Sequence, residues 1–127
     1  MKAIPMPIHE LCDRLTIVTL KLDRLPESEI DKNELRKQHA YYMEGIDKEN
    51  SKLMHLLLLL KSYNGMIWDL EYDLRKGLDE ELGLEEIGRR AIEIRNINKF
   101  RVEVKNKISE LMGQHEFRDC KMNHLSE

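Results

Sequence analysis

Polar and aromatic side chains recur at helical spacing in the stretch from residue 64 to residue 75. They stand three and four positions apart and are Asn64, Trp68, Glu71 and Arg75. At about 100° per residue they share a helical sector of roughly 60°. A guanidinium group offers fork-shaped donors to phosphate, an amide can read a base or sugar edge, and an indole can stack on a flat ligand. The spacing therefore predicts a face suited to an anion that carries a ring.

Two further stretches carry similar faces. Asn98, Arg101 and Lys105 share one face, and acidic and basic residues between 10 and 24 share another that is about 100° wide. If these faces meet, basic and amide groups converge and nearby carboxylates position them. The predicted ligand-binding set is Glu10, Asp13, Lys21, Asn64, Trp68, Glu71, Arg75, Asn98, Arg101 and Lys105. The alternative is a set of boundary positions, in which Glu71 and Arg75 form an exposed pair worth about 0.3–0.5 kcal/mol.

The elements that must position these residues are long amphipathic helices. Apolar residues recur at three- and four-residue steps, as in Leu11, Leu15, Val18 and Leu22. The pattern predicts helices over residues 7–24, 30–48, 51–76 and 84–112, followed by a polar C-terminal tail. Gly45 weakens the second helix, and Asn50 or Ser51 can cap a new helix start, so whether the second and third helices form one rod or two stays open.

The fold class that follows is all-α, with residues 1–127 as a single domain. Turn residues stop the helices at Pro26, Gly77 and Gly113. We expect an antiparallel helical bundle packed through its apolar stripes. Helices of about 26 to 30 residues are roughly 40 Å long and exceed what one small bundle covers. Self-association into a homo-oligomer is therefore expected.

Composition excludes several partners and compartments. The 127 residues contain 21 Lys and Arg against 24 Asp and Glu, a formal net charge of −3, with both signs interleaved along every helix. A general affinity for nucleic acid or an anionic membrane is not expected. The longest apolar stretch, Leu56 to Leu60, is far shorter than the roughly 20 residues of a membrane span. Two distant cysteines and the absence of a leader pattern favour a cytoplasmic, reduced protein.

Metal and nucleophile chemistry find little support. A zinc site from His115, Cys120 and His124 lacks a fourth ligand, and Cys12 fits a small core residue. The glutamates near residue 85 suit a helix start, where the dipole favours negative charge. No metal, cofactor or catalytic residue is therefore predicted.

Three stretches of the chain resemble a family of short all-helical proteins known only as a domain of unknown function. They are ELCDRLTIVTLKLDRL from Glu10 to Leu25, Asn64 with IWDLEYDLR from Ile67 to Arg75, and RNINKFRVEVKNKI from Arg95 to Ile108. The resemblance covers most of the chain outside residues 28 to 50. It gives weight to Glu10, Asp13, Thr16, Lys21, Asn64, Trp68, Glu71, Arg75, Asn98, Arg101 and Lys105. Thr19 and Lys99 stand where the family tends to have an acidic residue, which argues against a catalytic or metal-binding carboxylate at these positions. The resemblance implies no activity.

The function predicted from the sequence is non-catalytic binding of an anionic small molecule. A nucleotide or nucleotide-derived signal fits the basic, amide and indole groups, and sequestration of such a signal, as by a phage protein, is one concrete version. One alternative is a magnesium-dependent all-α nucleotide pyrophosphohydrolase with Glu71, Asp73 or Glu85 as ligands. Another is a helical protein–protein interaction module, since the helices are long, amphipathic and rich in methionine.

Overall fold

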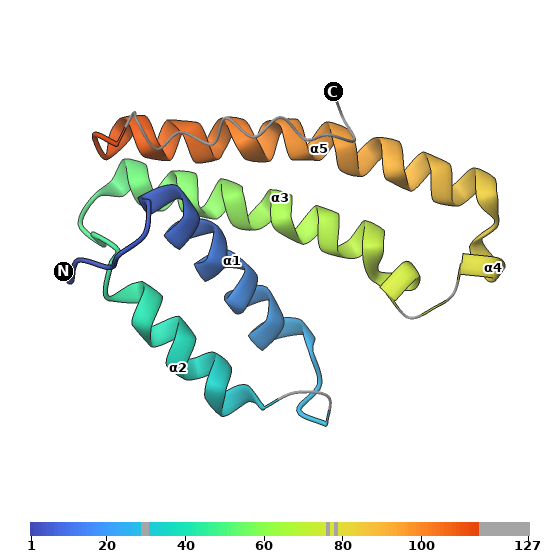
Figure 1. Cartoon of the computed structure of the whole chain (residues 1–127), viewed down its shortest axis with the longest axis horizontal. Coiled ribbons are helices and arrows are strands. Elements are labelled where there is room, and N and C mark those ends of the chain that lie inside the picture. Colours follow the sequence, from blue (N-terminus) through green and yellow to red (C-terminus); the bar gives the residue numbers. More distant parts are fainter. Residues whose placement is uncertain (29–30, 76, 78, 115–127) are drawn as a thin grey trace.

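The protein is all-helical in its computed structural model, which describes residues 1–28, 31–75, 77 and 79–114 (Figure 1). No strand occurs among these residues. The elements are α1 (Ile8–Arg24), α2 (Lys32–Met43), α3 (Ser51–Arg75), α4 (Asp79–Leu82) and α5 (Leu84–Leu111). The all-α class predicted from the apolar periodicity is thus confirmed.

Helix α1 begins and ends as its flanking prolines predict. Pro7 precedes the first helical residue, and the free amide of Ile8 donates to the Gln114 side chain at 2.8 Å, which ties the start of α1 to the segment after α5. Leu25 is extended before Pro26, because a residue that precedes proline avoids the helical region. The predicted range 7–24 therefore differs from the observed helix by one residue.

Helix α2 is shorter than the predicted range 30–48. It is capped by Asp31, whose carboxylate accepts from the Asn33 amide at 2.9 Å, and it ends at Met43. Gly45 follows, and its backbone packs closely against the N-terminal segment and α1. An added Cβ would lie 2.6 Å from the Leu11 side chain and 2.9 Å from that of Ile4. The chain turns at this glycine, so the second and third predicted helices are two separate helices.

The two long helices form a hairpin. Helices α3 and α5, with 25 and 28 residues, lie side by side and run in opposite directions (Figure 1). The loop predicted between Gly77 and Gly83 contains the four-residue α4, which the periodicity did not predict. Gly83 adopts φ +81°, a left-handed conformation that favours glycine, and it lets the chain turn into α5.

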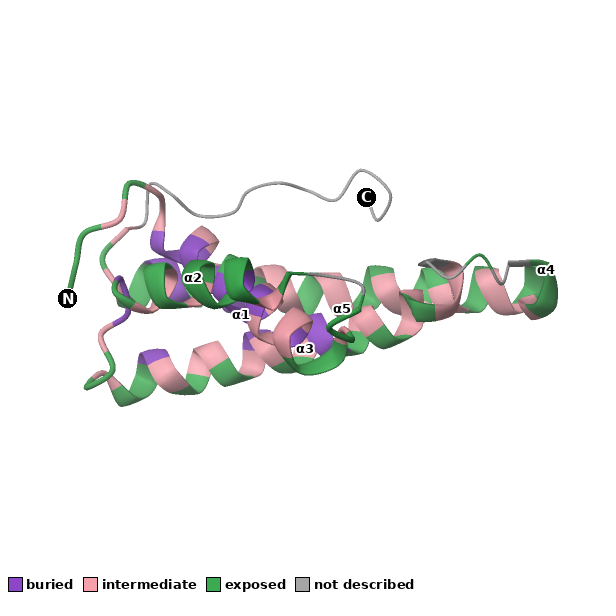
Figure 2. Ribbon diagram, turned by 90° about the horizontal axis from the view of Figure 1, so that it is seen from below, coloured by how far each residue is buried: buried purple, intermediate pink, exposed green. Residues whose placement is uncertain are grey.

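The core lies at one end of this hairpin. Helix α1 packs against both long helices there and α2 packs on α1, around a cluster that includes Leu11, Leu15, Leu53, Leu60 and Ile108. The buried residues of α3 fall within residues 53–65, and those of α5 within residues 104–109 (Figure 2). The rest of the hairpin, beyond α1, contains half-buried and exposed residues only, among those that the structure describes.

The helices of the described part are not membrane spans. None combines the length and the apolar composition that crossing a bilayer requires.

Candidate functional site

Six of the ten predicted ligand-binding residues meet where α1, α3 and α5 pack together. With Thr16 they form a connected set of hydrogen bonds that we call the polar network. Its members are Glu10, Asp13, Thr16, Asn64, Asn98, Arg101 and Lys105. Asp13, Thr16, Asn64 and Lys105 are buried, so the network belongs to the helix interface and not to the outer surface.

Arg101 is the hub of the polar network. Its Nε donates to Asn64 Oδ1 at 2.8 Å, its Nη1 to Asn98 Oδ1 at 3.0 Å and its Nη2 to Asp13 Oδ2 at 2.6 Å. One guanidinium thereby joins all three helices. The Asn64 amide completes the ring, because it donates to Asp13 Oδ1 at 3.0 Å and to Thr16 Oγ1 at 2.8 Å.

Lys105 is held by the two carboxylates of α1. Its Nζ lies 3.3 Å from Glu10 Oε1 and 3.9 Å from Asp13 Oδ2, and its side chain is only 4% exposed. A buried ammonium group needs such partners, because removing an unpaired charge from water costs several kcal/mol.

The polar network is balanced in charge. Two cations, Arg101 and Lys105, face two carboxylates, Asp13 and Glu10. An anionic ligand would have to displace a carboxylate that already accepts short, charge-assisted hydrogen bonds. The arrangement fixes how α1 sits on the hairpin, and it leaves little free positive charge for a ligand.

The remaining predicted residues lie outside the polar network or cannot be placed. Lys21 is half-buried on α1 and Glu71 is half-buried on α3, and neither has a hydrogen bond or ion pair to the network. Trp68 is half-buried one turn beyond Asn64 on α3. The side chain of Arg75 lies outside the described part, as does its predicted pair with Glu71. The convergence expected of Lys21 is therefore not part of this interface, and that expected of Arg75 falls on a side chain outside the described residues.

A second site, which the sequence did not reveal, lies where α3 begins and α5 ends. The first turns of α3 and the last turns of α5 line a groove of about 440 Å³, which we call the basic groove. Its lining residues are Ser51, Lys52, His55, Leu56, Lys107 and Leu111. None of them is acidic. Lys52, His55 and Lys107 have no ion pair or hydrogen bond from their side chains within the described chain.

The start of α3 adds positive potential to the basic groove. The helix has no acidic residue in its first turn, in contrast to α1, α2 and α5. Asn50 caps it by accepting from the Leu53 amide at 3.1 Å, while the amides of Ser51 and Lys52 have no acceptor in the described part of the chain. Free amides and the helix dipole both favour an anion at a helix start.

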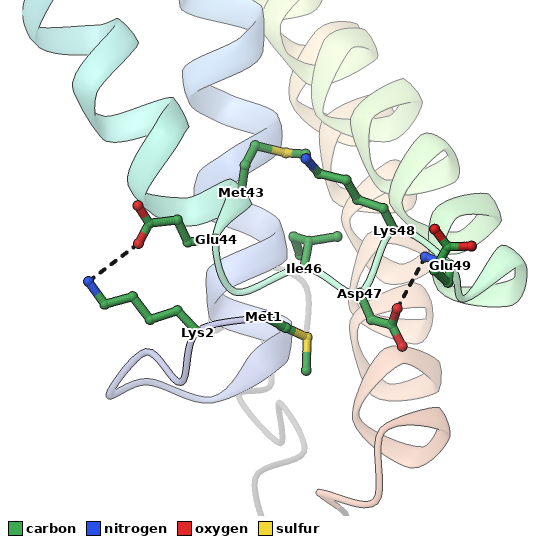
Figure 3. A pocket seen from close by; sticks show the side chains of 8 residues that line it. All are labelled: Met1, Lys2, Met43, Glu44, Ile46, Asp47, Lys48 and Glu49. Atoms are coloured by element: carbon green, nitrogen blue, oxygen red, sulfur yellow. Dashed lines mark hydrogen bonds and ion pairs between the residues drawn. The ribbon is translucent and has the colours of Figure 1, made fainter.

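Two other hollows are less suited to an anion. An open hollow of about 880 Å³ lies between the N-terminal segment and the connection from α2 to α3, and Figure 3 shows the side chains that line it. Its three carboxylates outnumber its two lysines, and Lys2 is already paired with Glu44 at 3.4 Å. A hollow of about 380 Å³ between α1 and α3 contains Arg24, whose guanidinium is paired with Asp69 at 2.6 Å.

Carboxylates near the far end of the hairpin are engaged by arginines. Arg90 on α5 donates to Asp73 on α3 at 3.0 Å and to Glu86 at 2.9 Å, and Arg89 also donates to Glu86. Hydrogen bonds from Arg89 and Arg90 lower the pKa of Glu86 to about 2. Among the described residues no group of three or more His, Cys, Asp or Glu side chains could hold a metal ion. His115, Cys120 and His124, which the sequence places in a polar tail, lie outside the described residues.

Comparison of the chain with models of known protein families, with curated proteins and with solved structures finds no match. The family resemblance noted in the sequence therefore stays a prediction, and we infer the function from the geometry of this chain.

Proposed function

We propose that the protein binds an anionic small molecule without converting it, and that the basic groove takes the anion. The observation that carries the proposal is the presence of three basic side chains, Lys52, His55 and Lys107, that have no partner among the described residues and lie around the start of α3. Free amides of Ser51 and Lys52 add donors at the same place. A phosphate group matches this set of donors in charge and in hydrogen-bonding capacity.

The remaining lining favours a ligand with an apolar or flat part. Leu56 and Leu111 line the basic groove together with the cations, so one end of a ligand contacts hydrocarbon while the other meets positive charge. A volume of about 440 Å³ lies within the range of small-molecule sites. A nucleotide or nucleotide-derived signal combines an anionic group with a ring, and we propose this class.

The proposed anion site is the basic groove and not the polar network, although the helical spacing predicted ligand binding by the residues of the network. Arg101 and Lys105 are neutralised by Asp13 and Glu10, whereas the cations of the basic groove are not. The magnesium-dependent alternative gains no support at Asp73, one of its three named ligands, because that carboxylate is engaged by Arg90. A binding role at the basic groove is therefore favoured over hydrolysis.

We also propose that the bundle is completed by self-association. The hairpin of α3 and α5 extends beyond α1, and its apolar residues there are half-buried or exposed within the described chain. Ile92 and Tyr72, for example, are 53% and 47% exposed. Apolar side chains left in water favour association, at about 25 cal/mol per Å² of area removed from solvent.

The anion proposal is tested by ligand-induced thermal stabilisation over a panel of nucleotides and sugar phosphates. A ligand at about 100 times its dissociation constant adds about 2.7 kcal/mol to the folded state, which raises the melting temperature. We expect Lys107→Glu to abolish the shift and Lys37→Glu, on the exposed side of α2, to preserve it, although both substitutions change the net charge equally. A shift that survives Lys107→Glu, or the absence of any shift across the panel, would contradict the proposal.

A further inference from the structure

One side of α5 is exposed along the part of the hairpin that extends beyond α1. Leu84, Gly88, Ile92, Arg95 and Lys99 fall within a helical sector of about 80°, and we call this sector the outer face of α5. It lies opposite the buried side of the same helix, which carries Val104 and Ile108. Leu84 is 89% exposed and Ile92 is 53% exposed, so the outer face combines apolar and charged groups in solvent.

Gly88 separates the two apolar side chains of the outer face. It lies one helical turn from Leu84 and one turn from Ile92. A Cβ built on Gly88 meets no atom of the described residues within 4 Å, so nothing in that part of the chain requires a glycine there. Glycine inside a helix costs about 0.5–1 kcal/mol relative to alanine. Contact with another molecule would explain a glycine here, because the absence of a side chain at residue 88 leaves a notch between Leu84 and Ile92. A side chain of the other molecule can fill this notch.

Charge along the outer face changes sign from one end to the other. Glu85 borders the outer face at the end near α4, where Glu80 and Glu81 are also exposed, and Arg95 and Lys99 belong to the face at its other end. Glu85, Arg95 and Lys99 have no ion pair within the described chain. Glu85 and Lys99 stand seven residues before and after Ile92. A face with this gradient is complementary to a reversed copy of itself.

We propose that two copies of the chain pair through the outer face of α5, with the helices antiparallel and the two-fold axis near Ile92. In this arrangement Ile92 of one copy meets Ile92 of the other, and Glu85 lies level with Lys99 of the second copy. The inference depends on the proposed self-association and specifies its surface, orientation and symmetry. It is independent of the anion proposal, because Lys52, His55 and Lys107 are not part of the outer face.

The first test is an analytical ultracentrifugation series on the full chain. The wild-type protein is expected to show a concentration-dependent dimer, and Gly88→Leu is expected to weaken it by at least about tenfold by filling the notch. The monomer should stay folded, because the Cβ of residue 88 meets open space. Leu58→Ala on α3, which removes a 67% exposed apolar side chain away from this face, is the control and should leave the dimer intact.

The second test is a charge exchange. Glu85→Lys or Lys99→Glu alone should weaken the dimer several-fold, and the double variant should restore it to within about twofold of wild type, because the reversed pair again has opposite signs. Restoration by a double variant is not expected if a different protein covers this face.

The third test is cross-linking by cysteine at the axis. In a Cys120→Ser background, Ile92→Cys should form a disulfide-linked dimer on oxidation, and Leu58→Cys should not. A wild-type chain that is monomeric at every concentration overturns both the outer-face pairing and self-association. A dimer that survives Gly88→Leu, shows no charge restoration and does not cross-link at residue 92 overturns the pairing alone.

Discussion

Asp13 is the residue on which the polar network depends most. Its carboxylate accepts from Arg101 and Asn64 and lies 3.9 Å from the Lys105 ammonium, in a position that is 6% exposed. Removing one partner of a buried ion pair leaves an uncompensated charge, which costs about 3–5 kcal/mol.

We therefore expect Asp13→Ala to lower the free energy of unfolding by about 3–5 kcal/mol, measured by urea denaturation. Glu10→Ala is the matched variant on the same helix. It should cost about 1 kcal/mol or less, because Glu10 is 37% exposed on its side chain and Lys105 keeps Asp13 as a partner. Equal decreases in the free energy of unfolding for the two variants would contradict the prediction that the polar network depends most on Asp13.

Cys12 is expected to be unreactive in the folded protein. Burial, with a smaller contribution from Asp13, raises the pKa of its thiol from 9.0 to about 12. The thiolate is the reactive form, so alkylation at pH 8 in a Cys120→Ser background should be slow until denaturant unfolds the chain. Equal alkylation rates in the folded and the unfolded chain would contradict this assignment.

The same pKa shift predicts a dependence of stability on pH. The folded chain favours the protonated Cys12 thiol, because its pKa lies above that of the unfolded chain. The contribution is fully present below pH 9.0 and is lost as the pH rises from 9.0 to about 12. Cys12→Ala should reduce this loss, measured by denaturation at several pH values over that range. An identical alkaline loss in Cys12→Ala and in wild type would count against it.

At the scale of elements, the turn between α2 and α3 depends on Gly45. The backbone there approaches the Leu11 and Ile4 side chains so closely that an added Cβ would lie 2.6 Å and 2.9 Å from their nearest atoms. Both side chains belong to or pack against the core, so they have little room to move.

We expect Gly45→Ala to lower the free energy of unfolding by about 1–3 kcal/mol, the usual cost of overpacking a core. Chemical denaturation measures it, and Leu11→Ala in the same background should relieve part of the strain. The two substitutions should therefore be non-additive. Unchanged stability in Gly45→Ala would show that the turn adjusts without cost.

At the scale of the whole molecule, the sequence predicted the helices better than their contacts. The bounds of α1, α3 and α5 lie within one residue of prediction, because apolar spacing, prolines and glycines are local signals. Helix α2 ends five residues earlier than predicted at Met43, since the requirement for Gly45 comes from Leu11 and Ile4, which are distant in sequence.

The candidate site shows the same division between local and distant information. Periodicity placed Asn64, Arg101 and Asp13 on faces that meet, but it could not show that Asp13 and Glu10 neutralise the cations, because that depends on how α1 sits on the hairpin. The basic groove joins residues 52 and 107, which come together only in the packed hairpin. The absence of an acidic residue in the first turn of α3 was the one local signal that pointed to it.

Anion binding at the basic groove is tested by an experiment that locates the anion on the molecule. We propose a ¹⁵N NMR titration of the full chain with the nucleotide that stabilises it most, against an inorganic phosphate series at equal ionic strength. We expect the amides of Ser51, Lys52 and His55 and those around Lys107 to shift and saturate together, and Lys107→Glu to remove the effect. Saturating shifts centred on Asn64 and Arg101, or no saturating shifts at all, would contradict anion binding at the basic groove.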